Sequence, residues 1–368
     1  MLHERKDMNT DDSTLEPGQR PKSKSRRVFA DEPKIQAPKK KMMKAAAIDE
    51  FGPPSALKIH ELPVPKVGPN EVLIALYASG VGVWDADIRG GWWPEDMDPP
   101  RFPLVLGSDG AGVIAEVGAK VKDFHTGDRV WAYEFINPKG GFYAEFVAVD
   151  ADHVGLVPKR LDLLQAGAMT VTGLTAIQGI QVHLKVRAVD TVLIFGASGA
   201  VGSLAVQFAK SYDAKVIGTA RSSEAKKLVR ELGADKIIDP TDHDAVEQIR
   251  AFAPNGIDAV LALAGGDSLQ RFLKLVRPGG RIAHPNGVEP EQESPPKVSR
   301  IPYDAEANSR EFERLNHAVD AARLRVPIAS IRPLEEADKA HERLEKGNVL
   351  GRIVLQIRSE KELREASE

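Results

Sequence analysis

The sequence contains no cysteine among its 368 residues. This absence excludes disulfide bonds, thiolate metal sites, iron–sulfur clusters and a cysteine nucleophile. The chain also lacks any run approaching the roughly eighteen apolar residues of a membrane span, and its N-terminus shows no signal peptide. We therefore expect a cytoplasmic protein with no membrane partner.

A large excess of charge of either sign is also missing. The formal net charge is −3, with 28% charged and 42% hydrophobic residues, which is typical of a globular protein and gives no reason to expect a nucleic-acid partner. Because a chain of this length exceeds one typical domain, we expect two domains.

The N-terminal segment, residues 1–41, has little that could form a core. It contains one aromatic residue, Phe29, and four prolines, and its 11 Lys and Arg against 7 Asp and Glu give a net charge of +4. Such a segment buries too little apolar surface to offset its chain entropy. We predict a disordered tail over 1–41 and a second, charged tail over 358–368.

The most informative stretch that is present is 191–210, TVLIFGASGAVGSLAVQFAK. Val192 to Phe195 is a short apolar run typical of a buried parallel strand, and from Val201 the apolar residues recur with a helical period. Glycines at the junction allow a tight turn, and unpaired N–H groups at the helix start favour an anion. An ordinary structural turn has the same spacing, but the flanking strand and helix favour a dinucleotide site formed by Gly196, Ser198, Gly199, Ala200, Val201 and Gly202.

The second strand of this unit, predicted over 215–219, ends without the acidic residue that usually holds the ribose 2′-hydroxyl of NAD. Arg221 and Ser222 follow instead, and no acid occurs before Glu224. A forked cation and hydroxyls suit a 2′-phosphate, so we expect NADPH, bound on this side by Thr219, Arg221, Ser222 and Lys226. The alternative is a solvated loop, with Lys226 on an exposed helix.

The remaining pattern divides the chain into two folding units. Residues 42–165 contain short apolar runs separated by turns with Gly or Pro, which predicts a small barrel-like β domain. A helix over 162–179 leads into alternating strands and helices, the pattern of a doubly wound parallel sheet. The proline-containing stretch 288–308 is predicted as a loop. The elements expected to return to the first domain are helices near 309–324 and 334–346 and a strand over 351–357.

The order of these motifs resembles the medium-chain dehydrogenase/reductase superfamily, in its zinc-free quinone-oxidoreductase branch. The matching segments are SGVGVWDADIRGG (79–91), LVLGSDGAGVIAEVGAKVKDFHTGDRVWA (104–132), ELGADKIID (231–239), LVRPGGRI (275–282) and GRIVLQI (351–357). The resemblance covers roughly residues 43–357 and implies an α/β fold. A GroES-like β-barrel domain, 42–165 and 305–357, would flank a Rossmann NADPH-binding domain, 166–304, with the active site in the cleft between them.

Zinc-dependent relatives hold their catalytic metal with Cys, His and Cys. The matching positions here are Gly82, Ser108 with Asp109, and about Ala168. None of Gly, Ser and Ala is a useful zinc ligand, and the nine histidines are scattered without ligand spacing. We expect no metal. Without a Lewis acid, oxidation of a plain alcohol is disfavoured, and reduction of an electron-poor acceptor remains.

The resemblance implies that Trp84, Asp85, Tyr143, Thr172 and Asn286 surround the nicotinamide and the substrate, with Trp92 and Trp93 at the cleft mouth. Gly82 replaces an Asn common in zinc-free relatives, so the role of that side chain is absent or taken by Trp84 or Asp85. The alternatives are plain packing for the aromatic residues and, for Asp85, an ion pair with Arg89. No general acid is identified, and water can supply protons in quinone reduction.

The leading interpretation is an NADPH-dependent, metal-independent reductase of quinones. The alternative within this class is a reductase of α,β-unsaturated aldehydes or ketones, and the alternative outside it is a non-enzymatic NADPH-binding interaction protein. The resemblance also implies a homodimer, because the last Rossmann strand, 280–285, would otherwise expose unpaired backbone groups. The other possibility is that the 288–302 loop covers that edge.

Overall fold

The computed structural model describes residues 41–288, 295–359 and 362. The predicted disordered tail, 1–41, lies outside these residues except for Lys41, and the predicted charged tail, 358–368, lies mostly outside them. The described residues all belong to one compact unit.

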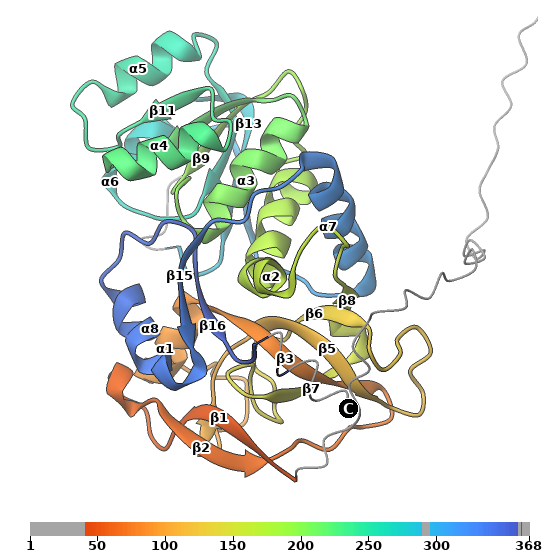
Figure 1. Ribbon diagram of the computed structural model, residues 1–368. Coiled ribbons are helices and arrows are strands. Elements are labelled where there is room, and N and C mark those ends of the chain that lie inside the picture. The colour runs from red at the N-terminus through yellow and green to blue at the C-terminus, as the bar shows by residue number, and fades with distance from the viewer. Residues whose placement is uncertain (1–40, 289–294, 360–361, 363–368) are drawn as a thin grey trace, which may run out of the picture. The chain divides into compact units, whose positions relative to one another are not determined.

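The first domain is built on two β-sheets (Figure 1). One sheet has the order β2-β1-β4, and the other has the order β15-β16-β3-β5-β6-β8, with β7 paired to β3. The bounds are β1 Met42–Ile48, β2 Lys58–Pro63, β3 Glu71–Val81, β4 Leu104–Val105, β5 Asp109–Val117, β6 Arg129–Tyr133, β7 Phe146–Asp150, β8 Val154–Leu156, β15 Ile328–Pro333 and β16 Arg352–Gln356. Its helices are α1 Val83–Gly90 and α8 Ala337–Glu345, with 3₁₀ turns at Pro54–Ala56, Ala151–His153 and Leu334–Glu336. Helix α7 Ser309–Ala322 packs on β8 and on helices of the second domain.

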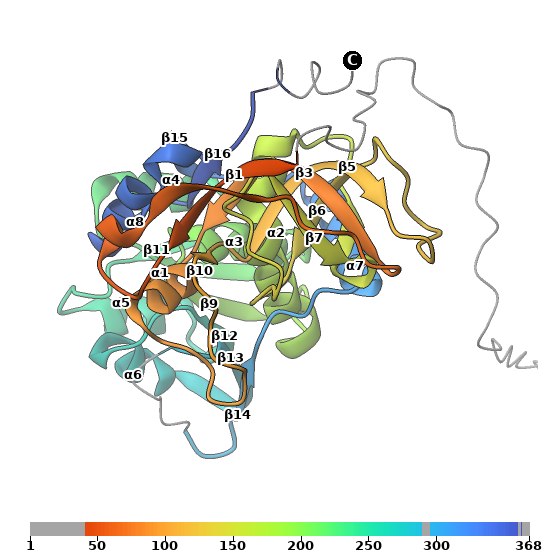
Figure 2. The same cartoon turned by 90° about the horizontal axis from the view of Figure 1, so that it is seen from below.

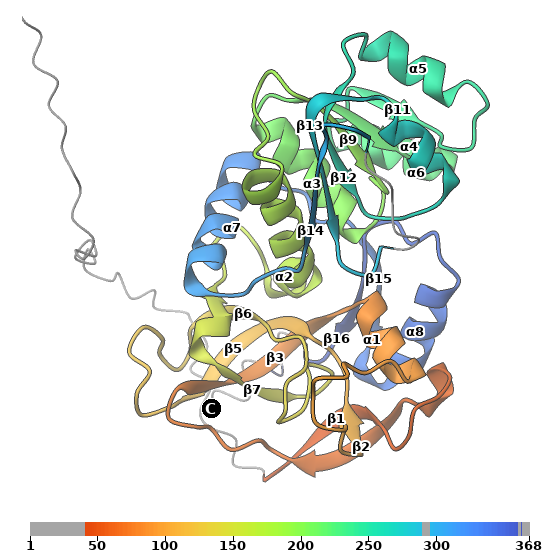
Figure 3. The same ribbon diagram turned by 180° about the vertical axis from the view of Figure 1, so that it is seen from behind.

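Of the three C-terminal elements expected to return to this domain, the helix near 334–346 and the strand over 351–357 lie in it. Strand β16 pairs antiparallel with β3, from Ile353 opposite Val81 to Gln356 opposite Ala78. Helix α8 lies beside α1, close to β15 and β16 (Figures 1 and 3). The pairing of β16 with β3 brings residues more than 270 positions apart into register and places the start of β16 beside the start of α1.

The second domain contains a six-stranded parallel sheet with the order β11-β10-β9-β12-β13-β14. Alternate residues of β9 enter two separate apolar clusters, Val192 and Ile194 with α3, and Leu193 and Phe195 with α5 and α6, which explains its unbroken apolar sequence. The strands are β9 Thr191–Phe195, β10 Lys215–Thr219, β11 Lys236–Ile238, β12 Ile257–Ala262, β13 Val276–Pro285 and β14 Ser299–Tyr303. The helices are α2 Leu163–Ile177, continued by a π turn over Gln178–His183, α3 Ala200–Ser211, α4 Ser223–Glu231, α5 Ala245–Phe252 and α6 Asp267–Leu273.

The prediction of a loop over 288–308 is wrong in part, because it contains strand β14. This strand pairs parallel with β13, from Ser299 opposite Arg281 to Tyr303 opposite Pro285 (Figure 2). A proline is tolerated on a strand at the edge of a sheet, and Pro302 lies there. The edge of the described sheet is therefore β14, and the 280–285 strand is covered.

Helix α2 lies between the two domains and packs on β3, β5 and α3 (Figure 3). Gly167 makes the contact close, since a Cβ at this position would lie 2.6 Å from the carbonyl oxygen of Ala78. Among the described residues one helical stretch, Leu163–His183, is long and apolar enough to span a membrane, but 83% of its apolar window is buried inside the fold. Its apolar character therefore follows from its position in the core.

Candidate active site

A cavity of about 810 Å³ lies where residues of the two domains meet. Gly82, Trp84, Ser108 and Arg352 line it from the first domain, and its opposite wall includes the Gly-rich turn after β9 and the end of β13. A cavity of this size and mixed lining is typical of a small-molecule site.

The Gly-rich turn has the geometry that an anion site requires. Gly196 has a φ of +91°, and a Cβ at Gly202 would lie 2.2 Å from the carbonyl oxygen of Gly196, so both positions need glycine. Helix α3 begins directly after Gly199, which caps it without a side chain, so its first N–H groups are unpaired. The predicted residues Gly196, Gly199, Ala200, Val201 and Gly202 line the cavity, whereas Ser198 does not; its carbonyl oxygen accepts a hydrogen bond from Gly351 (3.0 Å). The turn fits the pyrophosphate of a dinucleotide.

The side chains predicted to bind the adenosine side have local partners. Thr219 Oγ1 accepts the N–H of Gly196 at 2.8 Å, and Ser222 Oγ caps α4 by accepting the N–H of Ala225 at 3.1 Å. Lys226 is paired with Asp239 at 2.9 Å.

Arg221 is exposed and donates from Nη2 to Asn348 Oδ1 at 3.0 Å. Asn348 precedes Val349, which lines the cavity, so Arg221 lies near the cavity rim. Of the side chains predicted for the adenosine side, Arg221 alone combines exposure with this position.

Asp85 and Tyr143 lie beneath the cavity rather than in its described wall, in contrast to the expectation. Asp85 Oδ2 accepts hydrogen bonds from the N–H of Gly82 (2.8 Å) and the hydroxyl of Tyr143 (3.0 Å), and the same hydroxyl lies 3.2 Å from His341 Nε2. Both Asp85 and Tyr143 are buried. They hold the start of α1 in place through this chain of contacts.

The proposed pairing of Asp85 with Arg89 is not observed. Arg89 turns to Glu345 on α8, and the cation that faces Asp85 is Arg352. Helical spacing permitted the first contact, but the long arginine side chain reaches the neighbouring helix instead.

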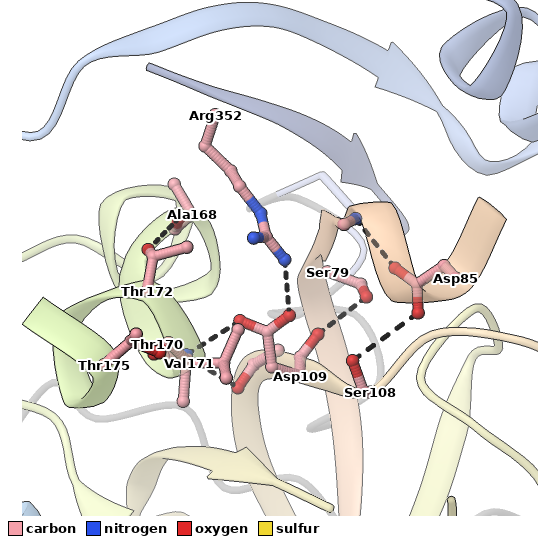
Figure 4. Close-up of polar contacts among 12 residues, drawn as sticks. Ser79, Asp85, Ser108, Asp109, Ala168, Thr170, Val171, Thr172, Thr175 and Arg352 are labelled. Atoms are coloured by element: carbon pink, nitrogen blue, oxygen red, sulfur yellow. Dashed lines mark hydrogen bonds and ion pairs between the residues drawn. The ribbon is translucent and has the colours of Figure 1, made fainter. Parts of the chain in front are cut away.

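An ion pair lies at the floor of the cavity (Figure 4). Arg352 Nη2 donates to Asp109 Oδ1 at 2.8 Å, and Asp109 Oδ2 accepts the N–H of Val171 at 3.0 Å. Ser79 Oγ donates to the backbone oxygen of Asp109 at 2.7 Å. Arg352 was missed as a functional residue; the available signal was a cation at the start of GRIVLQI, directly after a glycine.

Burial dominates the electrostatics of the two carboxyl groups near this floor. It raises the pKa of Asp109 and raises the pKa of Asp85 to about 6, while the positive charge of Arg352 lowers both. Burial likewise raises the pKa of the Tyr143 hydroxyl well above its usual range, so this group stays protonated.

The cavity also has an aromatic wall. The Trp84 ring lies 5.0 Å from that of Trp92 and 5.6 Å from that of Phe135, measured between centroids. Trp84 reaches across to the second domain, because a Cβ at Gly287 would lie 3.0 Å from its ring. Trp93 lies outside the described lining and donates to the backbone oxygen of Asp98. Such a wall favours a flat, apolar ligand.

The other two predicted residues, Thr172 and Asn286, both line the cavity. Thr172 Oγ1 lies 3.5 Å from the carbonyl oxygen of Ala168, and Asn286 Nδ2 donates to Asp304 Oδ2 at 2.7 Å. Their places, on α2 and after β13, are compatible with contact to one bound ligand.

The donor set does not suit a metal ion. Gly82 and Ser108 line the cavity, while Ala168 is buried below Thr172. In the described ranges, no group of three or more His, Asp or Glu side chains is arranged to hold a metal. Metal independence stays a prediction.

Comparison with known proteins decides the family. The chain matches the model of the alcohol dehydrogenase GroES-like domain over residues 68–159 and that of the zinc-binding dehydrogenases over residues 200–302. It is 32% identical over 330 residues to the quinone oxidoreductase of Mus musculus, with 86% of this chain and 98% of that protein covered. The chain belongs to the quinone oxidoreductase branch of the medium-chain dehydrogenase/reductase superfamily.

Other members of this superfamily are also similar. An alcohol dehydrogenase of Geobacillus stearothermophilus is 31% identical over 348 residues, with 86% of this chain and 100% of that protein covered. The structure of the Escherichia coli quinone oxidoreductase complexed with NADPH shares the fold, with a TM-score of 0.74 and 24% identity over 85% of this chain and 100% of that one. The predicted GroES-like and Rossmann folds are thereby confirmed, while the domain boundaries stay a prediction.

The raised pKa of Asp85 predicts a dependence of stability on pH. The folded-state pKa is about 6, against 3.8 as the ordinary value, so the folded state binds more protons between these values. The stability that protonated Asp85 contributes is therefore fully present below about pH 3.8 and is lost as the pH rises to about 6. We expect Asp85→Asn to lose this contribution, so that its melting temperature falls less than that of the wild type from pH 4 to pH 7.

Tyr143→Phe serves as the control, since it removes a partner of Asp85 but keeps the carboxyl group. Its melting temperature should still fall from pH 4 to pH 7, at least as steeply as that of the wild type, because the lost hydrogen bond favoured the ionised form of Asp85. The same change of melting temperature with pH in the wild type and in Asp85→Asn would contradict the raised pKa of Asp85.

Proposed function

We propose that this oxidoreductase passes a hydride from NADPH to a quinone without a metal ion. The observation that carries the proposal is that Gly82 and Ser108 line the cavity, with Ala168 buried below Thr172, at the positions that the family resemblance matches with the metal ligands of zinc-dependent relatives. Without such ligands the acceptor must itself spread the charge that it gains, as a conjugated quinone does.

The proposal of NADPH as the cofactor rests on residues near the pyrophosphate and nicotinamide positions and on Arg221 near the adenosine position. The unpaired N–H groups at the start of α3 would hold the pyrophosphate, and Thr172 and Asn286 would flank the ring that supplies the hydride. Arg221 would hold the 2′-phosphate by the charge-assisted hydrogen bonds that distinguish NADPH from NADH.

The chain's own residues contribute mainly by positioning. Trp84, Trp92 and Phe135 form an apolar wall against which a flat acceptor can stack, and the same wall excludes water. Holding the acceptor in a reactive geometry is itself worth several powers of ten in rate.

The reaction is tested by following NADPH consumption with a panel of quinones, α,β-unsaturated aldehydes and ketones. We expect turnover with quinones that is unchanged by a chelator, because no metal takes part. Turnover of simple secondary alcohols with NADP that disappears on chelation would contradict the proposal. Turnover confined to the unsaturated carbonyl compounds would favour the enone reductase. Tight NADPH binding without any turnover would favour the non-enzymatic alternative.

The cofactor preference is tested with Arg221→Ala. A charge-assisted contact contributes about 1.5–3 kcal/mol, so the apparent constant for NADPH should rise roughly tenfold or more, with that for NADH nearly unchanged. Lys227→Ala is the matched control: Lys227 is an exposed cation on α4 whose nearest described acid is Glu231, and its loss should affect neither cofactor. Equal losses for both cofactors in Arg221→Ala would refute the role of Arg221.

We further propose a homodimer that forms through the exposed edge of β14. This strand pairs with β13 on one side, and its other side pairs with no strand among the described residues, which leaves an edge that a second copy can extend. Light scattering at micromolar concentration should give twice the chain mass of 40.0 kDa. Ser299→Lys, on the exposed edge strand, should shift the protein toward monomer, and a monomeric wild type would contradict the proposal.

A further inference from the structure

We propose that Arg352 is a catalytic residue whose guanidinium receives the carbonyl oxygen of the acceptor, in the space that Gly82 leaves open at the cavity floor. The inference rests on the proposed function and adds to it the group that stabilises the charge developing on the acceptor.

Gly82 controls access to this guanidinium. Its φ of −117° is accessible to any residue, and the nearest heavy atoms to a Cβ there would be Arg352 Nη2 and Asp85 Oδ2, both at 3.4 Å. Glycine is therefore not required by the backbone or by packing. A longer side chain would extend over the guanidinium, and the glycine keeps this path from the cavity to Arg352 open.

Gly80, two residues earlier, differs in this respect. A Cβ at Gly80 would lie 2.6 Å from Arg352 Nε, so the guanidinium can lie against β3 only because Gly80 has no side chain. The two glycines thus have separate effects: Gly80 lets the guanidinium of Arg352 pack against β3, and Gly82 leaves it accessible from the cavity.

The guanidinium is held in advance of any ligand. Asp109 binds Nη2 at 2.8 Å and is itself fixed by the N–H of Val171, so the cation cannot swing away. Both terminal nitrogens lie near Gly82, Nη2 at 3.4 Å and Nη1 at 3.7 Å from the position of a Cβ there, and Nη1 makes no hydrogen bond within the described part of the chain. A largely buried arginine with unused donors at a cavity wall favours a ligand oxygen.

The charges around Arg352 allow a developing anion. Asp109 and Asp85 are the two carboxyl groups that face it. Burial raises the pKa of Asp85 to about 6, whereas the charge of Arg352 and the hydrogen bonds from Gly82 and Tyr143 favour its ionised form. Negative charge that forms next to Nη1 meets a cation whose bonded partner is Asp109, while Asp85 Oδ2 is already bound by two other donors.

The electron and proton balance requires no further reagent. The acceptor gains two electrons and one hydrogen as hydride from the reduced nicotinamide, which is oxidised, and it gains a second hydrogen as a proton from water. Between these events the negative charge resides on the acceptor's carbonyl oxygen. Preformed donors at such a position in other enzymes accelerate turnover by about 10²–10³-fold.

The test uses the paired substitution Arg352→Gln with Asp109→Asn, which removes both charges of the ion pair and leaves Asp85 with its hydrogen bonds from Gly82 and Tyr143. We expect this variant to fold and to bind NADPH within about threefold of the wild type, measured by fluorescence titration. Its rate of quinone reduction should fall on the order of a hundredfold. Across quinones of similar size, its rate should also depend more steeply on the acceptor's reduction potential.

Gly82→Leu completes a double-mutant cycle and tests the access path without altering the ion pair. It should slow quinone reduction in the wild-type background and have little further effect in the paired variant, because the covered group is then already absent. Additive losses would mean that leucine only blocks the acceptor sterically, which would overturn the proposal. If the paired variant does not fold, Gly82→Leu is compared across quinones of similar size: a rate that depends more steeply on the acceptor's reduction potential supports the proposal, and a uniform loss or an unchanged rate overturns it.

Two further outcomes separate the alternatives. A loss of NADPH affinity in the paired variant as large as its loss of rate would assign Arg352 to the cofactor, which overturns the proposal but leaves the quinone reductase function intact. A wild-type protein that reduces none of the quinones and enones would overturn the proposed function itself, and this proposal with it.

Discussion

The buried ion pair between Arg352 and Asp109 is the contact on which the site depends. It joins β16 to β5, and through the N–H of Val171 it also fixes helix α2 (Figure 4). A buried pair is stable only when its remaining donors and acceptors are satisfied or matched to a ligand. Three elements from distant parts of the chain are therefore held in one arrangement around the cavity floor.

The same short segment also connects the floor to the Gly-rich turn. Gly351 donates its N–H to the carbonyl oxygen of Ser198, and Gly351 and Gly199 form an isolated β-bridge. Gly351 can lie this close because a Cβ there would be 2.1 Å from the carbonyl oxygen of Pro327, and its φ is +87°. Consecutive residues, 351 and 352, thus fix the anion-binding turn relative to the acceptor side, which is the alignment that hydride transfer requires.

The sequence predicted those parts of the site whose residues are adjacent in the chain, and it did not predict contacts between residues that are far apart in the chain. The Gly-rich turn could be predicted because strand, turn and helix are adjacent in the chain. The strand shows as an apolar run, the turn as glycines, and the helix as a helical period of apolar residues. Strand β14 was missed because five residues with a proline acquire strand structure only by pairing with β13. Asp85 and Tyr143 were expected around the ligand because no pattern in the sequence shows their burial, which comes with their contact to each other and to His341 on α8. Arg352 lies 243 residues from its partner, so no spacing rule could connect the two.

The absence of metal ligands and the small residue at position 82 are linked physically. A divalent ion at the floor would compete electrostatically with a guanidinium a few ångströms away. Without the ion, Arg352 is the cation nearest the opening that Gly82 leaves. One guanidinium, already paired with Asp109, stabilises less negative charge than a zinc ion does. Under the proposed function, the acceptor contributes much of the stabilisation through its own conjugation, which is the physical reason for proposing quinones over plain carbonyl compounds.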